Sequence, residues 1–254
     1  MALMPLLLAL VAAALGGAIN SIAGGGSLLT FPAIVALGVS PLVANATNTV
    51  ALWPGSLGSL WGYRHEVAGS RAWLIRFTLP SLLGGVIGAW LLLHTGADRF
   101  ARIVPFLVLG ATVLFMIQGP LTGWLRGRGA VAGHAAPNWV FLVWQFSVGV
   151  YGGYFGAGIG ILMLAVLGLM GLTNIHQMNG LKNWGGLCIN LVAAAMFAAS
   201  GIVDWPLALA MACGGLLGGY AGSRMAQRVG QPAVRKAVVL IGFGSFAWLL
   251  LRPL

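Results

Sequence analysis

The chain has 254 residues, of which 59% are hydrophobic and only 6% are charged, and its formal net charge is +10. A soluble globule of this size needs far more polar side chains to cover its surface, so the composition excludes a soluble domain and predicts a protein embedded in lipid. Most of the Lys and Arg residues fall in short connections between apolar runs. Membrane topology therefore explains the positive charge better than nucleic-acid binding does.

Long apolar runs recur along the chain, and each is close to the roughly 20 residues that a helix needs to cross a bilayer. The runs cover residues 4–23, 73–93, 100–118, 137–155, 175–199, 205–223 and 233–251. Uninterrupted stretches such as 6–15 lack the alternation of a membrane β-barrel. No Lys or Arg precedes the first run, so we expect a mature helix there and not a secretion signal. The pattern predicts an all-α polytopic membrane protein.

The two halves of the sequence align without a gap when one is shifted by 134 residues. The matching pairs include Gly24 with Gly158, Gly26 with Gly160, Leu28 with Leu162, Asn45 with Asn179, Gly88 with Gly222 and Gly110 with Gly244. We therefore expect a first repeat at 1–118, a cytoplasmic linker at 119–136 and a second repeat at 137–254, with about five helical segments in each repeat.

The second segment of each repeat is short, at 24–38 and 158–172. Fifteen helical residues rise about 22 Å, which is less than the roughly 30 Å hydrocarbon core. These segments are expected to be broken or re-entrant, and the sequence leaves open whether they cross fully. In either case each repeat crosses an odd number of times, which predicts two repeats of inverted topology.

The loop charges agree with inversion, because basic loops stay cytoplasmic. The loop at 62–76 carries three arginines, whereas its counterpart at 200–206 carries only Asp204. With the first loop cytoplasmic and the second external, both termini are predicted to be external. The basic residues then placed in the cytoplasm are Arg64, Arg71, Arg76, Arg126, Arg128, Arg224, Arg228, Arg235 and Lys236. The loop with Asp98, Arg99 and Arg102 is the exception, since this scheme puts two arginines outside.

Glycine-rich stretches at 20–27 and 152–160 separate the first apolar segment of each half from the second. Glycine lets the backbone leave its helix, and the helix that restarts presents free N–H groups and a positive dipole end to an anion. Paired interrupted segments in both halves also point to a transport site. The alternative is close helix packing, which we expect for the mid-segment glycines at 84–88 and 218–222.

The third segment of each half carries polar side chains, which cost free energy in an apolar segment unless they bind something. Asn45, Thr47 and Asn48 lie in the first half, and Asn179, Lys182 and Asn183 in the second. Lys182 lies roughly 10 Å along its helix, so a binding role is favoured over an amine that reaches to the lipid headgroups. The 134-residue shift places Asn48 at the position equivalent to Lys182.

The acidic residues limit the substrate class, because Glu66, Asp98 and Asp204 are the only carboxylates and all lie at or near loops. A cation carrier or an internal acid relay for protons is therefore not expected. The sequence also lacks HExxH, CxxC and GxSxG motifs, so we expect no catalytic residues, no metal site, no cofactor and no enzyme activity.

These same residues resemble the TauE/SafE family of sulfite exporters, also called TSUP or DUF81. The resemblance covers nearly the whole chain and is carried by the strings at 23–26 with Pro32, 44–48, 154–160 and 176–183. It implies a multi-pass carrier of the bacterial inner membrane that moves sulfite or a related sulfur anion, usually outward. One departure is that residues 158–160 read Gly-Ile-Gly where the first half has three glycines.

The combined expectation is a secondary transporter that exports sulfite or an organosulfonate by alternating access at a central site. The predicted site comprises Gly25, Gly26, Ser27, Asn45, Thr47, Asn48, Gly158, Gly160, Asn179, Lys182 and Asn183. An anion channel and a non-transport membrane assembly protein remain alternatives. The partners expected are the small anion and the bilayer, with no nucleic acid, and the oligomeric state is undetermined.

Overall fold

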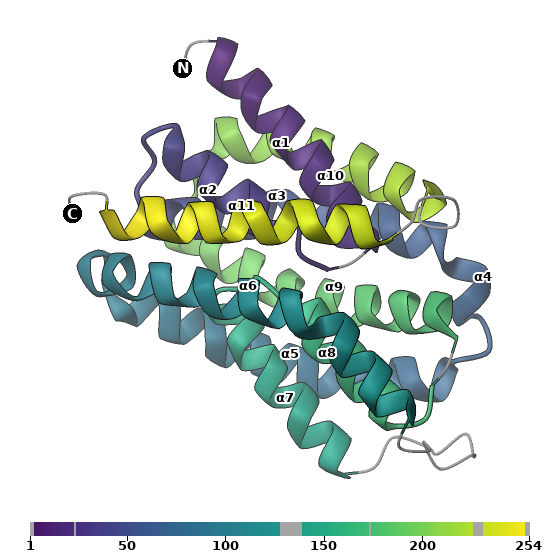
Figure 1. The fold of residues 1–254 in the computed structure, drawn as a ribbon. Coiled ribbons are helices and arrows are strands. Elements are labelled where there is room, and N and C mark those ends of the chain that lie inside the picture. The colour runs from purple at the N-terminus through teal and green to yellow at the C-terminus, as the bar shows by residue number, and fades with distance from the viewer. Residues whose placement is uncertain (1–2, 23, 128–138, 173, 226–230, 252–254) are drawn as a thin grey trace.

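The structure is a computed structural model that describes residues 3–22, 24–127, 139–172, 174–225 and 231–251. All secondary structure in these ranges is helical (Figure 1), which confirms the all-α prediction. The helices are α1 (Leu3–Ile22), α2 (Ser27–Ala36), α3 (Pro41–Gly62), α4 (Arg64–Val67), α5 (Arg71–Thr95), α6 (Ala97–Gly127), α7 (Trp139–Tyr154), α8 (Ile159–Leu169), α9 (Ile175–Ser200), α10 (Trp205–Met225) and α11 (Gln231–Leu251).

Four helices in the described ranges are long and apolar enough to cross a bilayer: Leu3–Ser21, Arg71–Thr95, Ala97–Ile117 and Ile175–Ser200. This agrees with a multi-pass membrane protein. Helix α6 continues to Gly127, and so covers the first part of the segment at 119–136 that was predicted as a linker. The rest of that segment lies outside the described residues.

Three pairs of equivalent helices begin 134 residues apart, as the sequence repeat predicts. Helices α3 and α9 begin at Pro41 and Ile175, α5 and α10 at Arg71 and Trp205, and α6 and α11 at Ala97 and Gln231. Local sequence explains individual starts, since a proline opens α3 and the Asn174 side chain caps α9 by accepting from the N–H groups of His176 and Gln177. Helix α4 has no helical counterpart between α9 and α10.

The second segments are short, as expected. Helices α2 and α8 have 10 and 11 residues, so they rise about 15 Å, half of a hydrocarbon core. Helix α2 turns back along α1. Gly26, at its start, lies so close to α1 that a Cβ on it would be within 3 Å of the Gly16 carbonyl. Helix α8 turns back along α7 in the same way, since the Trp144 indole N–H donates to the Leu162 carbonyl at 3.4 Å. Each short helix thus forms a hairpin with the helix before it.

The main packing pairs join helices from opposite halves of the sequence. Helix α1 packs on α10 and α10 on α3, and in the matching set α7 packs on α5 and α5 on α9. Glycine lines both seams: a Cβ on Gly218 would overlap the Ala14 carbonyl oxygen, and a Cβ on Gly88 would overlap the Val150 carbonyl oxygen. These close approaches match the packing role predicted for the mid-segment glycines.

Helices α3 and α9 meet at the centre of the molecule and run antiparallel. At one end, Tyr63 and Val67 beyond α3 pack on Gly180 near the start of α9. At the other end, the backbone N–H of Asp204, beyond α9, donates to Thr47 Oγ1 near the start of α3 at 3.0 Å. In Figure 1 the start of α1 and the end of α11 lie to the left, and α4 lies at the opposite end of the molecule.

Candidate functional site

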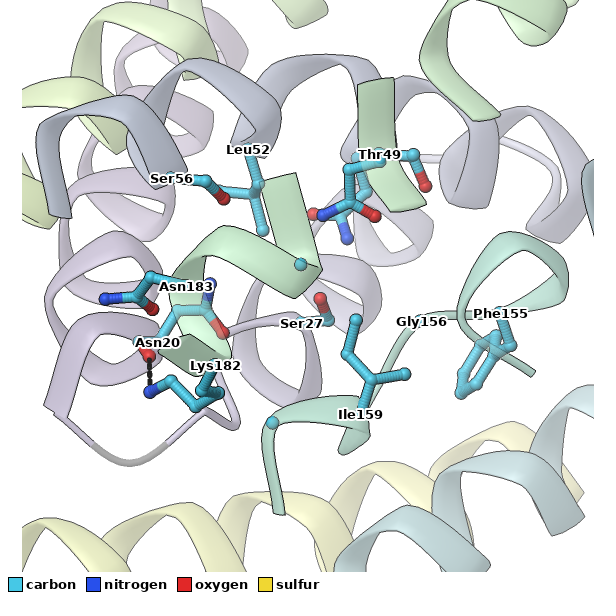
Figure 2. Close-up of a pocket in the computed structure, with 14 residues that line it drawn as sticks. Asn20, Ser27, Thr49, Leu52, Ser56, Phe155, Gly156, Ile159, Lys182 and Asn183 are labelled. Atoms are coloured by element: carbon cyan, nitrogen blue, oxygen red, sulfur yellow. Dashed lines mark hydrogen bonds between the residues drawn. The ribbon is translucent and has the colours of Figure 1, made fainter. Parts of the chain in front are cut away.

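A polar pocket lies where the two helix breaks meet α3 and α9 (Figure 2), and its cavity volume is about 30 Å³. One group of lining residues comes from the breaks and another from the two central helices. The lining comprises Asn20, Ser27, Asn48, Thr49, Leu52, Ser56, Phe155, Gly156, Ile159, Gly160, Lys182, Asn183, Gly186 and Asn190. A single buried water needs about 10–15 Å³ by this measure, so the cavity has room for roughly two waters.

The two breaks touch each other beside the pocket. Gly24 has φ +84°, and a Cβ there would lie 3.1 Å from Cα of Gly160. Gly156 and Gly158 also have positive φ values, +80° and +83°. Only glycine adopts this backbone readily, so both chain reversals and their mutual contact depend on glycine.

Each break is followed by a helix whose first turn has no side-chain cap. Gly26 precedes α2 and Gly158 precedes α8, and neither N-terminus has a capping hydrogen bond from the residue before it. The first turn of a helix carries the positive end of its dipole. Here the N–H groups of Leu28 and Leu29 in α2 donate to the Gly25 and Gly26 carbonyls, and the Ile161 N–H in α8 donates to the Gly158 carbonyl. Ser27 and Gly160, which lie in these first turns, both line the pocket.

The central helices contribute the same four positions from each half. Helix α3 supplies residues 48, 49, 52 and 56, and α9 supplies residues 182, 183, 186 and 190, each pair separated by 134. The pairs are Asn48 with Lys182, Thr49 with Asn183, Leu52 with Gly186 and Ser56 with Asn190. The pocket is therefore lined by residues that the 134-residue shift pairs with one another.

Lys182 is 3% exposed, and its amine donates to two backbone carbonyls at the end of α1. The distances are 3.0 Å to the oxygen of Asn20, drawn in Figure 2, and 3.4 Å to that of Ser21. In the other half, the Asn45 side-chain amide donates to the carbonyl of Tyr154, the equivalent of Asn20, at 3.0 Å. Each central helix thus holds the carbonyl end of the opposite half's first helix, once by a cation and once by an amide.

Other polar groups at the site have fewer partners. The Asn183 Nδ2 atom is buried with no hydrogen-bond partner among the described residues. Asn48 differs, because its Oδ1 accepts a hydrogen bond from Thr30 Oγ1 of α2. An unpaired buried donor is costly unless a ligand or water satisfies it. Asn183 is therefore the lining residue best placed to donate to a bound acceptor.

The structure brings five of the eleven predicted site residues to the pocket: Ser27, Asn48, Gly160, Lys182 and Asn183. The other six predicted residues do not line the pocket. Gly25 faces the Phe115 ring, Gly26 faces α1 and Gly158 lies against Ala111. Asn45 and Thr47 bond to Tyr154 and Asp204, and Asn179 is buried with its Oδ1 unpaired.

Nine lining residues are not among the eleven predicted site residues. They are Asn20, Thr49, Leu52, Ser56, Phe155, Gly156, Ile159, Gly186 and Asn190. Four of them nevertheless lie in the two glycine-rich breaks that were predicted to bind an anion, at positions 20, 155, 156 and 159. Positions 52, 56, 186 and 190 lie on the same helix faces as Asn48 and Lys182, four and eight residues further on.

The two ends of α3 and α9 are closed by different chemistry. At the α4 end, the buried Tyr63 ring lies 6.4 Å from the His176 ring, and both Tyr63 OH and His176 Nδ1 lack a partner among the described residues. The 134-residue shift relates these two residues to Phe197 and Leu42, which belong to one apolar cluster at the other end. The closure at Tyr63 has polar side chains, whereas the closure at Phe197 is formed by apolar side chains at the end that also carries the hydrogen bond from Asp204 N–H to Thr47 Oγ1.

The described residues contain no cluster of three or more His, Cys, Asp or Glu side chains suited to a metal ion. Glu66, Asp98 and Asp204 do not line the pocket, so Lys182 supplies its only formal charge. The arrangement suits a small acceptor or anion held by amides, hydroxyls and helix N-termini.

Comparison with known proteins places the chain in one family. Residues 8–249 match the family described as Sulfite exporter TauE/SafE. The probable membrane transporter protein YfcA of Escherichia coli K12 is 32% identical over 97% of this chain and 90% of its own length. Similar proteins are a probable membrane transporter protein of Haemophilus influenzae, 30% identical over 89% of this chain and 86% of its own, and ORF9 of Sinorhizobium sp, 30% identical over 96% and 91%.

No solved structure gives a significant match. The relatives are named as transporters and not as enzymes, which agrees with the sequence prediction. Since the family match covers almost the whole chain and four helices in the described ranges are of spanning length, this protein is a membrane transporter that belongs to the TauE/SafE family.

Proposed function

We propose that this chain exports a small sulfur oxyanion, with sulfite as the leading substrate, by alternating access at the pocket between the two helix breaks. The observation that carries the proposal is the pocket itself. It is small, central and polar, and it takes the same four positions from α3 and α9. The family description names sulfite export, and the pocket chemistry is consistent with it.

The pocket's charges favour an anion over a cation. Its single formal charge is the Lys182 ammonium, and its other polar groups are amides, hydroxyls and the first turns of two helices. A cation site in a membrane protein needs carboxylates or several free carbonyls, and the Asn20 and Ser21 carbonyls are already engaged by the amine. Asn183 Nδ2 adds a donor with no competing protein acceptor.

The pocket's size favours a small inorganic oxyanion over an organosulfonate. The cavity volume of about 30 Å³ has room for roughly two waters. Leu52, Phe155 and Ile159 form its apolar wall, so a substrate with a carbon chain would have to displace buried side chains. Sulfite requires the smaller rearrangement.

The arrangement of the helices around the pocket supports alternating access. Antiparallel α3 and α9, together with the exchanged packing of α1 on α10 and α7 on α5, support two halves of inverted topology. The short α2 and α8 then act as re-entrant helices whose breaks meet near the middle of the membrane. Opening the polar closure at Tyr63 or the apolar closure at Phe197 would expose the site to one side at a time.

The direct test is sulfite flux into proteoliposomes containing the purified protein. We expect Lys182→Ala and Asn183→Ala each to reduce the sulfite flux by tenfold or more, because each removes a donor from the pocket lining. Asn179→Ala is the matched control, since Asn179 is one helical turn away, equally buried and outside the lining. Unchanged flux in Lys182→Ala, or equal losses in all three variants, would contradict the proposed site.

The same assay separates a carrier from an anion channel. A carrier closes around each substrate, so the sulfite flux should saturate as the sulfite concentration rises. Flux that grows linearly, or electrical conductance too large for a carrier cycle, would favour the channel alternative.

A further inference from the structure

A shallow, open groove lies on the outer surface, in the seam between α3 and α10, and its volume is about 360 Å³. Its lining is apolar and partly aromatic: Leu57, Gly58, Trp61, Leu216, Leu217 and Tyr220. Trp61 and Leu217 are among its most exposed side chains, at 63% and 68%. The groove exists because Gly58 approaches the Leu216 carbonyl closely, which leaves a furrow between the larger flanking residues.

Two arginines stand at one end of this groove, each stacked on an aromatic residue that lines it. The Arg64 guanidinium carbon lies 4.9 Å from the Trp61 ring centre, and one of its N–H groups donates to the Trp61 carbonyl at 3.0 Å. The Arg224 guanidinium carbon lies 5.2 Å from the Tyr220 ring centre. Stacking on an aromatic ring uses the face of a guanidinium group and not its edge, and the N–H groups at the edge are the ones that bind anions.

The two arginines are brought together by the close contact of their helices. Helices α3 and α10 run parallel here, and a Cβ on Gly62 would overlap the Ser223 side chain. Arg64 and Arg224 each lie within two residues of this contact, and both are exposed. Two positive charges at neighbouring helix ends attract an anion to this end of the groove.

The repeat does not account for this feature. The positions 134 residues away from Trp61, Arg64, Tyr220 and Arg224 are occupied by Ala195, Ala198, Val86 and Trp90. The equivalent seam between α5 and α9 therefore has no arginine pair, and Trp90, the one aromatic residue at these four positions, packs on the His94 ring. The site belongs to one face of the protein only and is not a by-product of how the halves pack.

We propose that this groove binds an anionic phospholipid, with one acyl chain along the apolar furrow and the phosphate between Arg64 and Arg224. The apolar walls of the groove suit an acyl chain, and the cations at one end suit the anionic headgroup of a phospholipid. The N–H groups of an arginine also match the spacing of phosphate oxygens. The site is separate from the transport pocket, so the proposal does not depend on the substrate.

The test compares retained lipid by native mass spectrometry of the purified protein with equal amounts of phosphatidylglycerol and phosphatidylcholine of the same acyl chains. We expect at least a tenfold preference for phosphatidylglycerol, which falls to near parity in the double variant Arg64→Gln/Arg224→Gln. The control Arg71→Gln/Arg102→Gln loses the same charge at exposed positions away from the groove and should keep the preference.

Three results would overturn the proposal: no preference in the unchanged protein, equal loss in both double variants, or competition by inorganic phosphate as strong as that by the lipid. A dimer that retains no lipid and dissociates in Arg64→Gln/Arg224→Gln would instead assign the groove to a contact between two copies of the chain. Trp61→Ala adds an independent check, because removal of the stacking partner and groove wall should weaken lipid retention while the charge stays the same.

Discussion

At the scale of single residues, Lys182 is tied to the protein and also faces the site. Its amine donates to the carbonyls of Asn20 and Ser21, while its stem lines the pocket beside Gly160. The Asn20 carbonyl also accepts from the Gly24 N–H at 3.1 Å, so it stays paired if the amine turns away. A bound anion would compete with the Asn20 carbonyl for the Lys182 ammonium, and this carbonyl would keep its hydrogen bond from the Gly24 N–H.

The pair Leu52 and Gly186 gives a specificity test, because these equivalent positions both line the pocket but differ in size. We expect Leu52→Ala to widen the pocket and to raise the flux of a small organosulfonate relative to sulfite by about tenfold. The price in stability should be roughly 2–5 kcal/mol, as for other buried leucines. Competition between the two substrates in proteoliposomes measures the ratio.

Gly186→Ala is the opposite change at the equivalent position. A Cβ there meets no atom within 4 Å, so the methyl group enters the pocket without strain in the backbone. We expect weaker sulfite binding with normal thermal stability. If Leu52→Ala and Gly186→Ala leave the ratio of the two substrates unchanged, the pocket does not select the substrate.

At the scale of elements, the breaks depend on glycines whose roles differ. Gly24 needs a positive φ and touches the opposite break, whereas Gly25 and Gly26 are close-packing positions against Phe115 and α1. The sequence predicted the breaks correctly because clustered glycine interrupts two apolar runs in register. The sequence could not distinguish the roles of Gly24, Gly25 and Gly26, because tertiary contacts set the direction of the chain through a break.

Gly24→Ala tests this difference. A left-handed backbone costs a residue with a Cβ about 1–2 kcal/mol, and the contact with Gly160 adds a steric penalty. We expect a lower melting temperature and loss of sulfite flux. Gly110→Ala is the control, because a Cβ there meets nothing within 4 Å and its φ is not positive. Equal effects of the two substitutions would mean that the contact between the breaks is unimportant.

At the scale of the whole molecule, the 134-residue repeat was the most informative signal in the sequence. It anticipated the starts of α9, α10 and α11 from those of α3, α5 and α6, because hydrophobic runs and their flanking residues are local properties. It did not identify the acceptors of Lys182, which are backbone carbonyls far away in sequence. Contacts of that kind leave no trace in the side-chain pattern.

The predicted inversion can be tested by labelling single cysteines with a membrane-impermeant maleimide in intact cells. Ala68 and Ser200 are exposed and lie after α4 and at the end of α9. In a Cys213→Ser background, where the remaining Cys188 is buried, we expect Ser200→Cys to react from outside. Ala68→Cys should react only after the membrane is opened. Labelling of both from the same side would contradict inverted halves.

The exchanged packing of α1 on α10 and of α7 on α5 has a consequence for the gene. Each half of the sequence contains a glycine-lined helix whose partner is encoded in the other half. We therefore expect either half, produced by itself, to be degraded, because its glycine-lined helix has no partner helix to pack against. The two halves produced together as separate polypeptides should assemble, because each supplies the helix that the other lacks.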